Sequence, residues 1–130
     1  MTKSELTDAY PTDLPAWQAL EEHYRDDMRS SQLRDLFVNN RDRFNRFSLE
    51  AGDLFLDYSK NLINNKTRKL LVRLANEAGI PQAIGSMFAG DPINVTEQRP
   101  VLHVALRAEI SDEIAHDVPG VEDVWNTLER

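Results

Sequence analysis

The sequence predicts a mostly helical fold with a short β-strand or β-hairpin near residues 48–59. In several segments apolar residues recur at every third or fourth position, which is the period of an amphipathic helix. Around Leu54 the period shortens to two, as in a strand whose side chains alternate between two faces. Single glycines and prolines stand where these segments begin or end. A chain of 130 residues is long enough for one domain and short for two.

The composition argues against several classes of protein. Hydrophobic residues make up 41% of the chain, charged residues make up 28%, and the net charge is −7. Nucleic acid and anionic membranes repel such a chain, so we expect neither as its main partner. Without cysteine there is no disulfide, no thiolate zinc site and no cysteine nucleophile. No apolar run is long enough to span a membrane, and residues 1–13 lack the apolar core of a signal peptide. We therefore expect a soluble cytoplasmic protein.

The first helix is expected over residues 14–28, with Asp13 as its N-cap between two prolines. The opposite face of this helix is charged, and His23 lies among those charges, so we expect His23 to be solvated. The apolar stripe of the helix, which should face the core, is Trp17, Leu20, Tyr24 and Met28.

A second helical segment follows, with Ser30 or Ser31 as its cap and a break at residues 39–40. We expect Phe44 and Phe47 to be core residues rather than part of a ligand site. Residues 51–53 then form a turn signal, after which the strand period begins. The apolar positions with helical spacing in this segment are Leu33, Leu36, Phe37, Phe44 and Phe47.

A third helix is expected over residues 64–79, ending at Gly79, where a helix end favours a residue with positive φ. Pro81 opens the next short helix and Gly90 ends it. The stripe of the third helix is Leu70, Leu71, Leu74, Ala75 and Ala78. The residues of the short helix that we expect to be buried are Ile84, Met87 and Phe88.

The segment from residue 94 to residue 107 is the least regular in its pattern. Thr96 is a candidate N-cap for a helix that begins near Pro100. The apolar residues Val101, Leu102, Ala105 and Leu106 fit a helical face and partly fit strand alternation as well. The last helix is expected from Val121, with Val124, Trp125 and Leu128 on one side.

His103 is the histidine best placed for chemistry. On a helix, Arg99 and Arg107 would share its face, each four residues away. Two cations beside an imidazole lower its pKa and keep it neutral, which suits a proton acceptor or a hydrogen-bond donor. The alternative, which the sequence favours, is a structural histidine on a polar helix face. Glu97 fits the first turn of that helix, where the helix dipole favours a carboxylate.

Other candidates for chemistry are weaker. A metal site is one interpretation of the acidic segment 112–117, but no second cluster completes a coordination shell. Asp57 and Lys60 form either a catalytic pair or, as we prefer, an ion pair at a strand end. No glycine loop for a phosphate and no serine elbow is present. The residues of the acidic segment that would supply ligands are Asp112, Glu113, His116 and Asp117.

Four stretches follow one another along the chain: "LFVNNRDRFNRFSL" (36–49), "LDYSKNLIN" (56–64), "MFAGDPIN" (87–94) and "TEQRPVLHVALR" (96–107). In this order they resemble the N-terminal region of the glucose-6-phosphate isomerase (phosphoglucose isomerase) family. One departure is Pro100, where the family usually has alanine. Any one of them is only suggestive, whereas all four in order are specific.

The resemblance implies an α/β protein with two three-layer sandwich lobes, of which this chain is the mostly helical N-terminal segment, residues 1–130. It implies interconversion of glucose 6-phosphate and fructose 6-phosphate, in glycolysis and gluconeogenesis, by a cytoplasmic homodimer that needs no cofactor and no metal. The family's phosphate loops and its catalytic glutamate, histidine and lysine lie further along its chain and have no counterpart here. We therefore expect no catalytic residue in this chain and no activity of this chain alone.

The residues that carry the family signature are accordingly expected to be structural. They are Asp57, Tyr58, Ser59, Lys60, Asn61, Asn94, Thr96, Glu97, Arg99, His103 and Arg107. Two further expectations follow. The helix with Leu70, Leu71 and Leu74, and also Trp125, should find too little to pack against and leave apolar surface exposed. The alternative to an isomerase segment is a free-standing small helical module that binds a protein.

Overall fold

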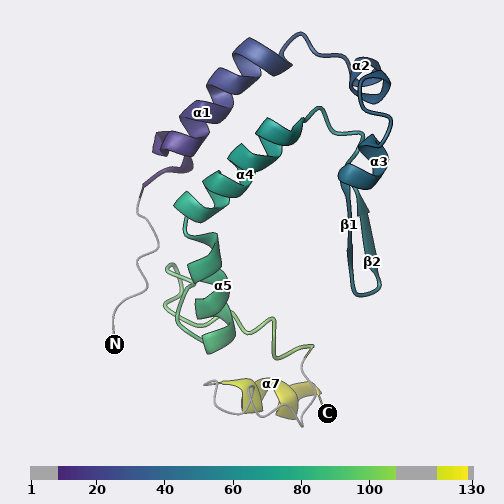
Figure 1. Ribbon diagram of the computed structural model, residues 1–130. Coiled ribbons are helices and arrows are strands. Elements are labelled where there is room, and N and C mark those ends of the chain that lie inside the picture. The colour runs from purple at the N-terminus through teal and green to yellow at the C-terminus, as the bar shows by residue number, and fades with distance from the viewer. Residues whose placement is uncertain (1–8, 108–119, 129–130) are drawn as a thin grey trace. The chain divides into compact units, whose positions relative to one another are not determined.

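The computed structural model describes residues 9–107 and 120–128 and divides the chain into two compact units. One unit is Ala9–Glu77, and the other contains the described residues from Ala78 onward. Helices dominate both units, and a single antiparallel hairpin lies in the first, as the sequence predicts (Figure 1). None of the described helices is both long enough and apolar enough to cross a bilayer.

The first helix confirms the predicted span but not the predicted cap. After a 3₁₀ turn η1 (Pro11–Asp13), α1 (Pro15–His23) runs directly into a π-helical turn η2 (Tyr24–Met28). Asp13 is not the N-cap, because it lies inside η1 and Leu14 takes that position without a side-chain bond. Glu77 supplies the missing acceptor instead: its Oε2 accepts the backbone N–H of Ala16 at 2.8 Å.

The buried face of this helix also differs from the predicted stripe. Met28 is buried as predicted, but Tyr24 is 57% exposed, and Ala16 and His23, which lie outside the predicted stripe, are buried. The cause is the neighbour: α4 (Asn65–Glu77) packs along α1, and the two helices lie side by side (Figure 1). His23 is therefore not solvated, which corrects the sequence prediction.

The second helical segment breaks at residues 39–40, as predicted, into α2 (Leu33–Val38) and α3 (Arg43–Arg46). Neither predicted serine caps it. Gln32 holds the N-cap position without a side-chain bond, and the hydroxyl of Ser31 donates to the carbonyl of Asp27 at 3.0 Å. Phe47 is buried as predicted, but Phe44 is 49% exposed. Its ring lies beside that of Phe55 in the hairpin, with 5.9 Å between the ring centroids.

The hairpin consists of β1 (Ser48–Ala51) and β2 (Leu54–Asp57), with Gly52 in the turn at a φ of +57°. Its register pairs Leu49 with Leu56 and Glu50 with Phe55. Because directly opposed residues of an antiparallel pair point to the same face, the two faces differ in composition. The face of Leu49 and Leu56 is apolar, whereas the other face is mixed.

The third helix, α4, leaves Leu71 45% exposed, with Leu70 and Leu74 half-buried, as the sequence leads us to expect. In the second unit, α5 (Ile80–Ala89) begins after Gly79 and ends at Gly90, whose φ angles are +74° and +73°. Both glycine ends are thus confirmed. The expected burial of Ile84 and Phe88 is wrong, since they are 49% and 54% exposed and no described residue of their unit covers them.

The second unit has a small core around α7 (Val121–Leu128). Ala105, Val121 and Trp125 are buried there, and the indole N–H of Trp125 donates to the Ala105 carbonyl at 3.1 Å. The expectation that Trp125 lacks packing is therefore wrong. Leu128, the outer end of the predicted stripe, is 60% exposed.

The helix predicted from Pro100 does not form. Residues 103–107 are turns, in which Ala105 donates to the carbonyl of Leu102 and Arg107 donates to that of Val104. These bonds span three residues rather than the four of an α-helix. In place of a helix, this segment packs against α7, where the Ala105 carbonyl accepts the indole N–H of Trp125.

Candidate functional site

The first signature loop, Asp57–Asn61, follows β2 and is fixed by a buried arginine from α3. Arg43 is 1% exposed. Its Nε donates to the Ser59 carbonyl at 2.7 Å, and its Nη2 donates to the carbonyls of Asn61 and Ile63 at 2.8 and 2.9 Å. The guanidinium thus binds three backbone acceptors of one loop, which its planar fork of donors allows and an ammonium group would not match.

Aromatic rings complete the surroundings of Arg43. Its guanidinium carbon lies 4.4 Å from the ring centroid of Phe47 and 5.5 Å from that of Phe37. A cation over the face of a ring is attracted by the ring's quadrupole. Burial lowers the pKa of the Arg43 guanidinium from its ordinary value. We call Arg43 and the loop Asp57–Ile63 that it binds the Arg43 clasp.

Asp57 closes the start of this loop. Its Oδ1 accepts the backbone N–H of Ser59 at 2.9 Å, and its Oδ2 lies 3.7 Å from the ammonium of Lys60. Hydrogen bonds from Ser59, and secondarily the charge of Lys60, lower the pKa of the Asp57 carboxyl from 3.8. Lys60 itself is exposed and Ser59 is buried. The pair therefore has the geometry of the ion pair favoured by the sequence, at the end of a strand.

The second signature loop, residues 94–99, is held by its own side chains. Asn94 and Arg99 form an isolated antiparallel bridge, and Gln98 has a φ of +53°. The Oδ1 of Asn94 accepts from the Thr96 hydroxyl at 2.8 Å and from the Glu97 N–H at 3.2 Å. Glu97 also pairs with the guanidinium of Arg99. Thr96 thus caps no helix; its hydroxyl belongs to this closed turn.

His103 and Arg107 lie beyond this loop and are both exposed. The acid–base interpretation of His103 needed Arg99 and Arg107 on its own helix face. Without that helix, the four-residue spacing no longer places the two arginines beside the imidazole. The structure therefore removes the geometric basis of that interpretation.

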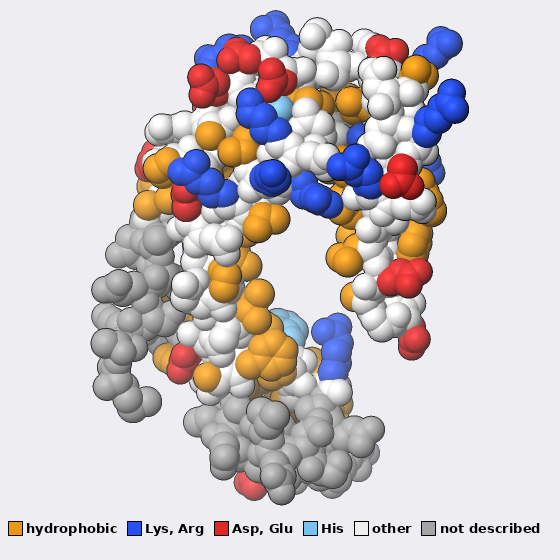
Figure 2. Space-filling view, in the orientation of Figure 1, with side chains coloured by type: hydrophobic (Ala, Val, Ile, Leu, Met, Phe, Trp, Pro, Cys, Tyr) orange, Lys and Arg blue, Asp and Glu red, His pale blue; other side chains and the backbone are white. Residues whose placement is uncertain are grey.

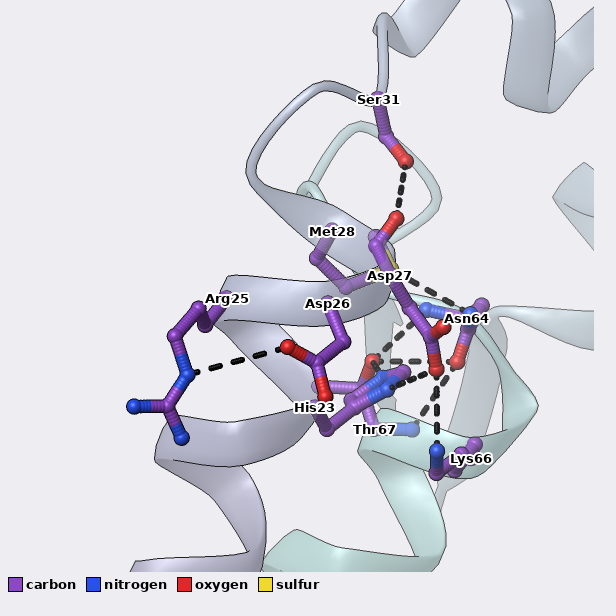
Figure 3. Close-up of polar contacts among 9 residues, drawn as sticks. All are labelled: His23, Arg25, Asp26, Asp27, Met28, Ser31, Asn64, Lys66 and Thr67. Carbon is purple, nitrogen blue, oxygen red and sulfur yellow. Dashed lines mark hydrogen bonds and ion pairs between the residues drawn. The ribbon is translucent and has the colours of Figure 1, made fainter.

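A polar cluster in the first unit was not found by sequence reasoning. It links α1 to the start of α4 through His23, which is 2% exposed (Figure 3). The ring Nδ1 of His23 donates to Oδ2 of Asp27 at 2.8 Å, and its Nε2 lies 2.8 Å from Oγ1 of Thr67. Lys66 donates to the same Asp27 oxygen at 2.9 Å.

Thr67 belongs to a reciprocal cap at the start of α4. Its backbone N–H donates to Oδ1 of Asn64 at 3.0 Å, and its Oγ1 accepts the Asn64 N–H at 3.1 Å (Figure 3). Two donors at a helix start are satisfied in this way. We call His23, Asp27, Asn64 and Thr67 the His23 clasp. The three-residue spacing of Asn64 and Thr67 and the four-residue spacing of His23 and Asp27 are the sequence signals that indicate it.

The order carboxylate–imidazole–hydroxyl in this clasp also occurs in hydrolytic triads. Here the hydroxyl of Thr67 already contacts both the amide and the side chain of Asn64, and the imidazole is buried between two helices. A hydroxyl held by Asn64 and His23 beside a buried imidazole has the geometry of a structural contact rather than of a nucleophile open to substrate. The cluster therefore acts as a structural link between α1 and α4.

Charges at the surface of the clasp are mutually stabilised. The hydrogen bond from Lys66, and next that from His23, lowers the pKa of the Asp27 carboxyl from 3.8. The same bond raises the pKa of the Lys66 ammonium from 10.5. Asp27 is therefore ionised at neutral pH and accepts hydrogen bonds only.

Metal ligation finds no support in the part of the chain that the structure describes, where no group of three or more histidine, aspartate or glutamate residues is placed to hold an ion. The metal candidate in the acidic segment, which comprised Asp112, Glu113, His116 and Asp117, lies outside the described residues.

Comparison with known proteins decides the family. A family model described as phosphoglucose isomerase matches residues 57–130, which include both signature loops. The chain belongs to the phosphoglucose isomerase family. The similarity extends upstream of this match, since the chain is 51% identical over 121 residues to glucose-6-phosphate isomerase of Pseudomonas entomophila (strain L48).

Other relatives in the family agree. Glucose-6-phosphate isomerase of Nitrosospira multiformis is 51% identical and that of Pseudomonas fluorescens (strain SBW25) is 46% identical, each over 121 residues. Each alignment covers 90% of this chain and 22% of the relative. The chain thus spans about a fifth of the length of the isomerases that it matches.

Proposed function

We propose that this chain forms the N-terminal scaffold of an aldose–ketose isomerase that interconverts glucose 6-phosphate and fructose 6-phosphate. The supporting observation is the family match over residues 57–130 together with 51% identity to a glucose-6-phosphate isomerase. The family's role in glycolysis and gluconeogenesis, its cytoplasmic location, its homodimer and its two α/β sandwich lobes belong to the same proposal.

The contacts of the signature residues support a scaffolding role. Ser59 is buried and its carbonyl accepts from Arg43, and Asp57 accepts the N–H of Ser59. Asn94 and Glu97 bond within their own turn. Side chains and carbonyls occupied in this way position the backbone rather than contact a substrate. The proposal therefore assigns the proton transfer to regions of the family that this chain does not span.

A chimera tests this proposal. The 121 matching residues of the Pseudomonas entomophila isomerase are replaced by the corresponding residues of this chain, and turnover of glucose 6-phosphate is measured by coupled assay. We expect the chimera to be active, because the swapped segment supplies the same scaffold. The matched control is the 130-residue chain alone, for which we expect no turnover above a mock preparation. A folded but inactive chimera, or turnover by the chain alone, would contradict the proposal.

A further inference from the structure

The hairpin carries one face that is wholly apolar and open. Leu49, Ala51, Leu54 and Leu56 share this face by the register of the two strands. The three leucines are 56%, 76% and 57% exposed in chain order. Hydrophobic side chains are accordingly visible on the surface of the hairpin in Figure 2. We call these four residues the hairpin face.

Such a face is unfavourable in water. A lone two-stranded hairpin has marginal stability, and both of its strands are edges with unpaired backbone groups. The mixed face already has a neighbour, since Phe55 packs beside Phe44. On the hairpin face, by contrast, each of the three leucines is more than half exposed. Its composition is that of an interior surface rather than of a solvated one.

A second copy of this chain that touched the hairpin face alone would bury too little area for a stable dimer. Strands of four residues at about 3.3 Å per residue extend only ~13 Å, so two strands offer on the order of 130 Å². A stable protein–protein contact uses about 800 Å² from each partner. The occupant must therefore engage more of the unit than this face alone.

Exposed apolar residues elsewhere in the unit extend the surface available to a larger occupant. Val38 in α2 is 67% exposed, Val72 in α4 is 59% exposed, and Leu62 after the hairpin is 43% exposed. The relatives supply a candidate for such an occupant, because about four-fifths of their length lies outside the match to this chain. That remaining portion is long enough to cover several elements at once.

We propose that the hairpin face docks against the portion of a phosphoglucose isomerase that this chain does not span. This inference rests on the proposed function, because it takes its occupant from the isomerase family. The contact is apolar, with Leu49 and Leu56 at its centre and Leu54 at the turn end. It makes the hairpin an internal packing element of the isomerase and not a surface projection.

Thiol labelling tests the inference, because the chain has no cysteine of its own. Leu56→Cys is introduced into the 130-residue chain and into the chimera, and the labelling rate of this position is followed by mass spectrometry of the peptide that carries it. We expect labelling to be at least about tenfold slower in the chimera, because burial excludes the reagent. Glu50→Cys, on the mixed face of the same hairpin, is the matched control and should change less.

Each outcome decides the inference. Equal labelling of Leu56→Cys in both proteins overturns it, as does a chimera that cannot fold with this hairpin. A dimer of the isolated chain that Leu56→Asp dissociates, measured by light scattering, overturns it in favour of a second copy. Leu128→Asp, at a leucine of similar exposure in the other unit, is the control for that measurement. An inactive chimera with protected Leu56→Cys refutes the proposed function alone, and an active chimera with unprotected Leu56→Cys refutes the inference alone.

Discussion

The two signature loops of this chain are held in opposite ways. The loop after β2 is bound by Arg43, a buried side chain 16 to 20 residues earlier in the sequence. The loop from Asn94 to Arg99 is bound by its own exposed side chains, none more than three residues from its partner. Both loops carry the family signature, so a shared signature does not imply a shared way of building the structure.

The difference lies in what each loop loses when one side chain is removed. Without Arg43, three carbonyls lose their donor: the bond to Ser59 is buried, and those to Asn61 and Ile63 are partly buried. Without Glu97, the side chains of Asn94 and Arg99 can form hydrogen bonds with water instead, because the Arg99 side chain is 66% exposed. A buried acceptor left without a partner costs about 1–3 kcal/mol, whereas an exposed pair contributes ~1 kcal/mol or less.

The largest effect is expected for Arg43→Met, which removes the donor of the Arg43 clasp. Because three carbonyls are affected, the free energy of unfolding should fall by at least ~3 kcal/mol in urea denaturation. Arg46→Met, an exposed arginine in the same helix, should change it by less than ~0.5 kcal/mol. Equal effects of the two variants would remove the distinction between buried and exposed anchoring. Arg43→Lys should remain destabilising, since an ammonium cannot match the fork.

The second effect is expected for Thr67→Val in the His23 clasp. The change leaves the amide of Asn64 without its acceptor and Nε2 of His23 without its partner, while Nδ1 keeps Asp27. We expect a loss of about 1–3 kcal/mol in the free energy of unfolding. The control is Thr127→Val, whose exposed hydroxyl bonds only to the Asp123 carbonyl. A loss no larger than that of the control would show that the clasp adds nothing to the contact between α1 and α4.

The third effect depends on pH. The folded pKa of Asp27 is lowered by Lys66 and His23, so its contribution to stability is present above the unfolded pKa, near 3.8. It is lost as the pH falls through the folded value. On acidification below pH 3.8, the melting temperature of the wild-type chain should therefore fall more than that of Asp27→Asn. Asp53→Asn, in the hairpin turn, should follow the wild type; parallel pH profiles for wild type and Asp27→Asn would contradict the assignment.

The smallest effect is expected in the 94–99 loop. A double-mutant cycle of Glu97→Gln and Arg99→Gln should give a coupling free energy of ~1 kcal/mol or less, because both side chains are more than half exposed. Raising the salt concentration should reduce it further. A coupling as large as the effect of Arg43→Met would mean that the exposed loop is anchored as firmly as the buried one.

What the sequence predicted correctly is local. Gly79 and Gly90 end helices because their positive φ is a property of single positions. The hairpin follows from the change to a period of two and from the turn at Gly52, within about ten residues of chain. The break between α2 and α3 likewise depends only on the residues around it.

What the sequence missed depends on distant partners. His23 lies among charged residues in the sequence. It is buried because α4 packs along α1 and brings Thr67, 44 residues later, into contact with its ring. The cap of α1 comes from Glu77, 61 residues after Ala16, so Asp13 is not needed. The segment after Pro100 forms turns that pack against α7, where Trp125, 20 residues after Ala105, bonds to the Ala105 carbonyl. In each case a contact between residues far apart in the sequence overrides the local preference on which the prediction rested, and periodicity does not reveal such contacts.

The short sequence span of the Arg43 clasp has a consequence for synthesis on the ribosome. All its acceptors lie within 20 residues of Arg43, so the clasp can close before α4 has emerged. The His23 clasp must close a loop of 44 residues, which at (3/2)RT ln n costs about 0.9 kcal/mol more than a loop of 16. We expect the hairpin region to be ordered on the nascent chain before α1 finds α4, and arrested chains ending between these points would show it by protection from protease.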